Sequence, residues 1–328
     1  MLLEIRKRKM NGLQGEREEK KYLFDRMGVY LCLLVVLVLA TTAILLIPFE
    51  DTYIGESGAD GAYRTYFVIL AIGSTLVFVL GFFNNAMVWM EGKVGGVEDG
   101  APRSRKLAVS SRKLLGAVFS RDFLRHLRIF FGDAILTRKL GRISKARWFF
   151  HALILLGFLG TFVLDIVTVI GVDFLQSHSF TDPLGWGKLW IRDFGFEVFG
   201  LMLLVGLAAA SVRRFVRRPA QLVTGGEDVT SILFLFIVVL SGFILEGVSM
   251  ASGLPGHESP QAYSFVGAAF AQFLPSVSPL VYSQIWLVHA AISFAFIAYI
   301  PFSKLFHIFA APLAIQVEGI IRLKEGGE

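Results

Sequence analysis

Long apolar stretches separated by short polar segments dominate the sequence. An α-helix rises about 1.5 Å per residue, so roughly 20 mostly apolar residues cross a hydrocarbon core of about 30 Å. The pattern therefore predicts an all-α membrane protein with about six transmembrane helices. The stretches that are long enough are residues 29–48, 66–90, 148–170, 194–210, 231–250 and 282–312.

The basic residues predict how these helices are oriented. Positively charged loops are retained on the cytoplasmic side of a membrane. If the chain starts in the cytoplasm, every Lys and Arg except Arg64, Lys188 and Arg192 falls on the cytoplasmic side. We therefore expect a multi-pass protein of the cell (inner) membrane with both termini in the cytoplasm. The net charge of +6 then belongs to the inner membrane face, and nucleic acid is set aside as a partner.

Cysteine usage limits the cofactors that this chain can hold alone. The composition is 55% hydrophobic, and the single cysteine, Cys32, lies in an apolar run. Iron–sulfur clusters and structural zinc sites are built from several cysteine ligands. Any such cluster must therefore lie in a partner subunit.

Hydropathy and charge divide the chain into five parts. These are a cytoplasmic N-terminal segment (1–28), two additional transmembrane helices (29–91), a basic cytoplasmic connector (92–147), a four-helix membrane domain (148–312) and a cytoplasmic tail (313–328). In the connector, Phe123 and Leu127 alternate with Arg125 and Arg128. This alternation predicts an amphipathic helix on the inner surface, in contact with membrane lipid or with a docked partner.

Three histidines within the predicted helices carry the candidate chemistry. His151 starts the helix at 148–170, near the cytoplasmic face, whereas His289 and His307 lie on the last helix. Their 18-residue spacing is five helical turns, which places both on one face about 27 Å apart. Because the last helix runs from the outer to the inner side, His307 lies at the same membrane depth as His151. Pro301, between them, predicts a bend.

Two neutral imidazoles from neighbouring helices are a typical axial ligand pair of a low-spin haem b. The inner pair, His151 and His307, therefore predicts a haem site. Alternatively, each reaches water or a lipid headgroup, and His289 makes an interhelical hydrogen bond to a Ser or Asp. Gly157 and Gly160 are small enough to admit a macrocycle or a close helix crossing. The remaining histidines, His126, His178 and His257, are expected to face solvent.

The spacing H-x17-H, which closes in IPFSKLFHIFAAP, resembles the gamma subunit family of respiratory nitrate reductase over residues 130–312. This family includes the membrane cytochrome subunits of heterodisulfide reductase and of the sulfite-reduction-associated membrane complex. The resemblance implies a cytochrome b with an inner haem held by His151 and His307. The family's second histidine on the earlier helix is replaced by Thr161, so His289 lacks its expected partner.

Three accounts of His289 stay open. His178 or His257 could fold back as the second ligand of an outer haem. Alternatively, a single haem is present and His289 lines a quinone pocket, or His289 is structural. Asp165 and Glu246, in the outer halves of their helices, are candidates for a quinone or proton site, since quinol oxidation releases protons. Glu197 is expected to reach water at the end of its helix.

Together these observations predict a b-type cytochrome subunit with one haem or two. It would pass electrons between membrane quinone and an iron–sulfur subunit of the heterodisulfide reductase or ferredoxin type on the cytoplasmic face, without completing a reaction alone. The alternatives are a haem-free membrane anchor of a redox complex and a proton-coupled transporter.

Overall fold

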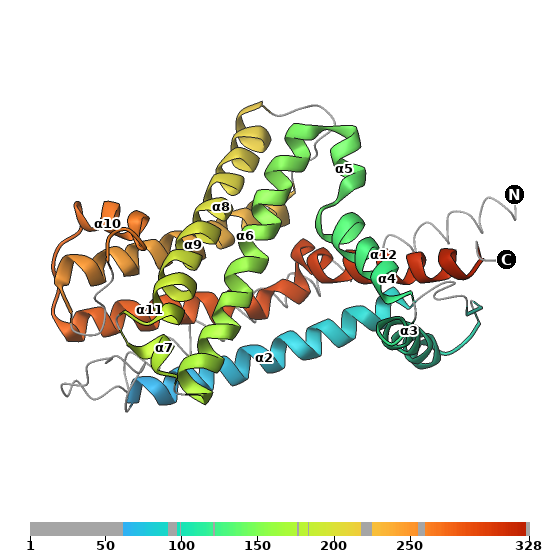
Figure 1. Ribbon diagram of the computed structural model, residues 1–328, viewed down its shortest axis with the longest axis horizontal. Helices are drawn as coiled ribbons and strands as arrows, with labels where there is room; N and C mark the ends of the chain where they lie inside the picture. The colour runs from blue at the N-terminus through green and yellow to red at the C-terminus, as the bar shows by residue number, and fades with distance from the viewer. Residues whose placement is uncertain are drawn as a thin grey trace, which may run out of the picture.

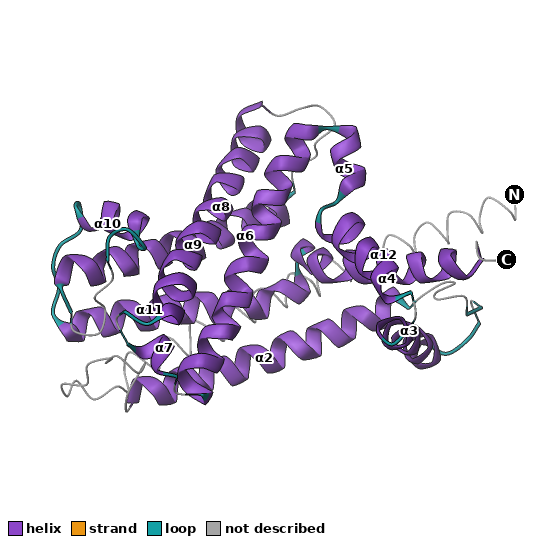
Figure 2. Ribbon diagram, in the orientation of Figure 1, coloured by secondary structure: helices purple, strands orange, loops and turns teal. Residues whose placement is uncertain are grey.

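The computed structural model describes residues 62–90, 97–98, 100–120, 122–175, 177–182, 184–217, 225–254 and 260–325. These ranges contain helices and no strand (Figures 1 and 2). The expected helix at 29–48 and His257 lie outside them. The all-α class is confirmed.

Six helical segments in the described ranges are long and apolar enough to cross a membrane. They are built on α2 (Ala62–Trp89), α6 (Lys145–Val169), α8 (Phe194–Ser211), α9 (Gly226–Ser252), α11 (Pro279–Tyr299) and α12 (His307–Glu325). The first four coincide with stretches predicted from the sequence. The last two divide the single stretch predicted at 282–312, and the protein is a multi-pass membrane protein.

The prediction of one continuous helix over residues 282–312 is wrong, because the helix is interrupted between α11 and α12. Two short 3₁₀ turns, Ile300–Phe302 and Lys304–Phe306, separate the two helices. Pro301 has no N–H and its ring clashes with the preceding helical turn. Ser303 has extended backbone, with φ −123° and ψ 171°, and its Oγ accepts a hydrogen bond from Leu305 N at 3.2 Å. The chain therefore bends and restarts, and His289 and His307 lie on different helices.

The long helices pack in the order α6, α8, α9, α11 and α2 (Figure 1). Helices α6 and α8 approach most closely where glycines leave room. A Cβ added at Gly157 would lie 2.7 Å from the backbone N of Leu203, and one added at Gly206 would lie 3.0 Å from the backbone N of Ile154. An added Cβ at Gly160 would likewise meet the ring of Phe199. These small residues therefore serve a close helix crossing.

Aromatic side chains join the four helices of the membrane domain. The ring of Phe296 on α11 lies 6.0 Å from that of Phe158 on α6 and 5.4 Å from that of Phe234 on α9. Leu203 from α8 is buried in the same cluster. Ser231 and Tyr299 add a buried hydrogen bond of 3.1 Å between α9 and α11. This core holds α6 and α11 on opposite sides of one apolar centre.

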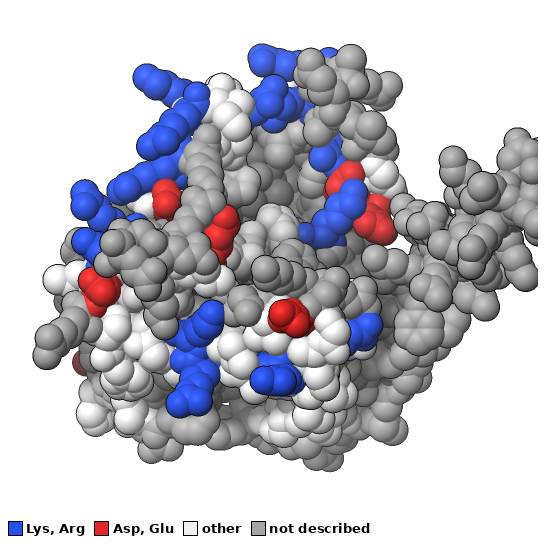
Figure 3. Space-filling model, turned by 90° about the vertical axis from the view of Figure 1, so that its right-hand side faces the viewer, with Lys and Arg blue, Asp and Glu red and all other residues white. Residues whose placement is uncertain are grey.

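Short helices cover the two ends of the bundle. At one end, α12 packs against α3 (Arg103–Val118), α4 (Phe123–Ile129) and the π-helical turn η1 (Phe130–Ile135), while α5 (Arg138–Ile143) leads into α6. Figure 3 shows many Lys and Arg side chains on this face. At the other end lie η2 (Ile170–Phe174), α7 (His178–Thr181), η3 (Gly187–Asp193) and α10 (Phe265–Ala271), whereas η4 (Val212–Arg217) extends α8.

Candidate functional site

His151 and His307 are brought together by α6 and α12. They lie close enough for their charges to interact. His151 Nδ1 is buried and has no hydrogen-bond partner among the described residues. His307 Nδ1 lies 2.5 Å from the carbonyl oxygen of Lys304. A histidine that donates Nδ1–H to a backbone carbonyl keeps its Nε2 available for a metal.

The break before α12 positions His307. The 3₁₀ turn presents the Lys304 carbonyl to the imidazole, and the Lys304 side chain reaches Asp228 on α9 at 3.0 Å. Asp228 also pairs with Arg214 at 2.8 Å, and its carboxylate accepts a hydrogen bond from Gly225 N. Asp228 therefore joins the ends of α8 and α9 to the turn that carries His307. Sequence reasoning missed this network, because its members lie far apart in the chain.

His289 makes the interhelical hydrogen bond that was one of its predicted alternatives. Its Nδ1 lies 2.8 Å from Ser241 Oγ on α9, and its ring packs against Gly242. Thr161 turns back on its own helix, where its hydroxyl donates to the carbonyls of Gly157 and Phe158. His178 is exposed on α7, as expected. The contact that the structure gives His289 is thus with a hydroxyl and not with a second histidine.

Two carboxyl groups, one buried and one half-buried, meet at the opposite end of the bundle. Glu197 on α8 is only 1% exposed and accepts hydrogen bonds from Val266 N at 2.6 Å and Gly267 N at 3.0 Å. Its carboxyl group is also hydrogen-bonded to that of Glu246 on α9. Ionised carboxylates are acceptors only, so this bond requires one proton on the pair. The expectation that Glu197 reaches water is therefore wrong.

The surroundings of this carboxyl pair are also polar. Lys188 and Asp193 form a buried ion pair of 3.2 Å, and the charge of Asp193 acts on Glu246. The absence of a side chain at Gly267 leaves room for the Glu246 carboxyl, since an added Cβ would lie 2.7 Å from Oε2. Asp165 is exposed on α6 and is not among the groups that act on Glu246. The structure thus joins Glu246 to Glu197 rather than to Asp165.

His126 does not face solvent as predicted. It is 8% exposed between α4 and α12, and its Nδ1 has no hydrogen-bond partner among the described residues. Gln316 Nε2 on α12 donates to the His126 carbonyl at 3.4 Å. The reason is that α12 covers α4, which follows from the helix break and not from the local sequence.

The donor atoms present fit a haem better than a metal ion held by several side chains. Within the described ranges, no three His, Cys, Asp or Glu side chains gather to hold a metal ion. A haem needs only two axial ligands from the protein. His151, with an unpartnered buried Nδ1, and His307, with its Nδ1 held by a backbone carbonyl, are two imidazoles of the type that such ligation requires.

These features define a multi-pass α-helical membrane protein with two histidines at one end of its bundle that are close enough for their charges to interact. Residues 138–324 match the family model described as nitrate reductase gamma subunit. The match covers more than half of the chain, which belongs to this family. The resemblance noted from the sequence is confirmed.

Curated relatives are similar over most of this chain. One is a subunit of the dihydromethanophenazine:CoB–CoM heterodisulfide reductase of Methanosarcina acetivorans, 29% identical over 275 residues, which are 79% of this chain and 94% of that protein. Its counterpart from Methanosarcina mazei is 27% identical over 274 residues, 79% of this chain and 96% of that protein.

A third relative is a larger protein. The EtfAB:quinone oxidoreductase of Syntrophomonas wolfei is 28% identical over 276 residues, 78% of this chain. The aligned region spans about a third (34%) of that relative's length. No solved structure matches this chain.

Proposed function

We propose that the protein is a b-type cytochrome subunit of a membrane redox complex, which passes electrons between quinone in the bilayer and a partner on the cytoplasmic face. The observation that carries this proposal is that His151 and His307 lie close enough for their charges to interact, inside the region that matches the family. The names of the relatives support it, because they specify quinone or dihydromethanophenazine as a reactant.

His151 and His307 are the proposed axial ligands of one haem b. When bound, the haem supplies one-electron transfer. The Lys304 carbonyl fixes the His307 ring and keeps its Nε2 directed away from the turn. His289 is assigned a structural role through Ser241, because the described residues bring no second histidine to it. A single haem therefore accounts for the side chains that the structure places.

The carboxyl pair is the proposed proton acceptor at the outer end. Oxidation of a quinol releases protons as its electrons leave, so a group beside the reacting ring must take them. Glu246 and Glu197 lie together, with Glu197 inside the protein, so a proton taken up at this end can be held between the two carboxyl groups. Asp165, exposed on α6, is a second candidate for this role.

The inner face is the proposed docking surface for an iron–sulfur partner of the heterodisulfide reductase or ferredoxin type. The connector 92–147 supplies the basic side chains gathered on this face (Figure 3). We place residues 148–312 as the haem domain, in the cell membrane with both termini in the cytoplasm. This orientation rests on the distribution of Lys and Arg.

The proposed function is tested by adding a soluble quinol to membranes that contain the protein and recording the visible spectrum. We expect the absorption bands of a reduced haem b, and their loss in His151→Ala, with His178→Ala as the control. A chain without haem absorbance would overturn the proposal and favour a haem-free anchor or a transporter. A haem that dithionite reduces but quinol does not would refute the link to quinone.

A further inference from the structure

A groove on the inner face of the protein runs along α4 and η1. Its volume is about 290 Å³. It is lined by four apolar side chains, two arginines and a glycine, namely Leu124, Leu127, Phe131, Leu136, Arg128, Arg138 and Gly132. It lies outside the histidine pair and the carboxyl pair.

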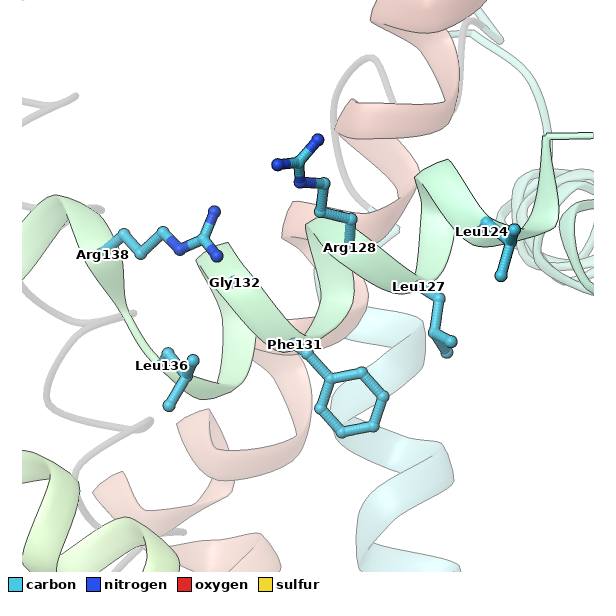
Figure 4. A pocket seen from close by; sticks show the side chains of 7 residues that line it. All are labelled: Leu124, Leu127, Arg128, Phe131, Gly132, Leu136 and Arg138. Atoms are coloured by element: carbon cyan, nitrogen blue, oxygen red, sulfur yellow. The ribbon is translucent and has the colours of Figure 1, made fainter.

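The groove has an apolar side and a basic side. In Figure 4 the apolar side chains point one way from the helix, whereas the guanidinium groups of Arg128 and Arg138 lie on the other side. The apolar side chains are open, with Leu124 77% and Phe131 52% exposed. Both arginines are exposed, and neither has an ion-pair partner among the described residues. The groove therefore combines exposed apolar side chains on one side of the helix with two positive charges on the other.

A glycine fixes the position of one arginine. An added Cβ at Gly132 would lie 2.8 Å from Arg138 Cζ and 2.9 Å from its Nη1. The guanidinium thus lies against the backbone at Gly132, in space that a side chain at this position would fill. Planar guanidinium groups bind phosphate through paired hydrogen bonds. Gly132 is therefore part of the basic side of the groove.

Trp148, near the start of α6, indicates the level of the groove in the membrane. Trp148 Nε1 on α6 donates a hydrogen bond to the Leu136 carbonyl at 2.6 Å, and the Trp148 ring packs on Gly141. Tryptophan prefers the boundary between hydrocarbon and water. The groove therefore lies at the level where lipid headgroups meet acyl chains.

We propose that this groove binds one anionic phospholipid, whose phosphate lies between Arg128 and Arg138 and whose acyl chain covers Phe131 and the leucines. The position of the groove at the membrane boundary favours a lipid over a protein partner. Charge complementarity favours an anionic headgroup over a zwitterionic one. The proposal does not depend on haem or quinone.

The test is native mass spectrometry of the full chain in detergent, with phosphatidylglycerol, phosphatidylcholine or glycerol 3-phosphate added. We expect retention of phosphatidylglycerol, reduced about tenfold by the double variant Arg128→Gln and Arg138→Gln. Gly132→Leu should weaken retention as well, because it displaces Arg138. The matched control is Arg125→Gln with Arg142→Gln, two exposed arginines outside the lining.

Several results would overturn the proposal. These are equal retention of phosphatidylcholine, equal retention by the double variant, or an equal loss in the control. Binding of glycerol 3-phosphate at similar strength would indicate a phosphate site without a lipid. Binding of an acidic protein that needs both arginines, with no lipid retained, would indicate a docking surface instead. Unchanged circular dichroism and unfolding temperature exclude misfolding as the cause of a loss.

Discussion

A single methyl group at Gly157 tests the close contact between α6 and α8. The added Cβ would lie 2.7 Å from Leu203 N and 2.8 Å from the Phe199 carbonyl oxygen. Both are backbone atoms, so no side chain can rotate to relieve the clash. We expect Gly157→Ala to push α6 away from α8. His151 lies earlier on the same helix and should move with it.

The magnitude follows from two opposing effects. Overpacking in a tight interior costs about 1–3 kcal/mol. Alanine is favoured over glycine inside a helix by up to about 1 kcal/mol. The expected net loss of stability is therefore about 1–2 kcal/mol. Haem content should fall as well, because the proposed haem ligand His151 shifts relative to His307.

Gly73→Ala on α2 is the matched control, since nothing lies within 4 Å of a Cβ added there. The assay is thermal unfolding of the detergent-purified protein by circular dichroism, with haem measured per polypeptide. Gly73→Ala should leave both values unchanged or raise the unfolding temperature slightly. If Gly157→Ala unfolds at the same temperature as Gly73→Ala, the proposed close contact is wrong.

Three further variants test the site. Asp228→Asn should lower the free energy of unfolding by about 1–3 kcal/mol, chiefly because the mostly buried Arg214 loses the carboxylate that it pairs with. An unchanged unfolding temperature would argue against the network. Glu246→Gln can still donate to Glu197, so the fold and haem content should persist while the rate of quinol oxidation falls at least about tenfold. Exposed Glu227→Gln on the same helix is its control, and equal rates would remove the carboxyl pair from the reaction. Ser241→Ala should leave haem content unchanged if His289 is structural, whereas loss of half the haem would indicate an outer haem.

Hydropathy was sufficient to predict the class of fold, because crossing a bilayer requires long apolar helices whatever their neighbours. It could not predict that residues 282–312 are divided. Pro301 predicted a bend, yet the new helix also depends on the extended backbone of Ser303 and its hydrogen bond to Leu305. His307 still lies close enough to His151 for their charges to interact, although it begins a separate helix, α12.

The sequence predicts the helices better than it predicts which polar side chains are buried. Glu197 is buried because backbone N–H groups of Val266 and Gly267 reach it from almost 70 residues away. His126 is buried because α12 folds back over α4. Nothing in the local sequence around either residue specifies these neighbours. Local periodicity gives the faces of a helix, but tertiary packing decides what covers them.

The most direct test of the central claim is haem quantified per polypeptide in the wild type and in His151→Ala, His307→Ala and His289→Ala. We expect one haem b in the wild type, its loss in the first two variants and its retention in the third. Two haems in the wild type, or full haem content in His307→Ala, would contradict the assignment of a single haem to His151 and His307.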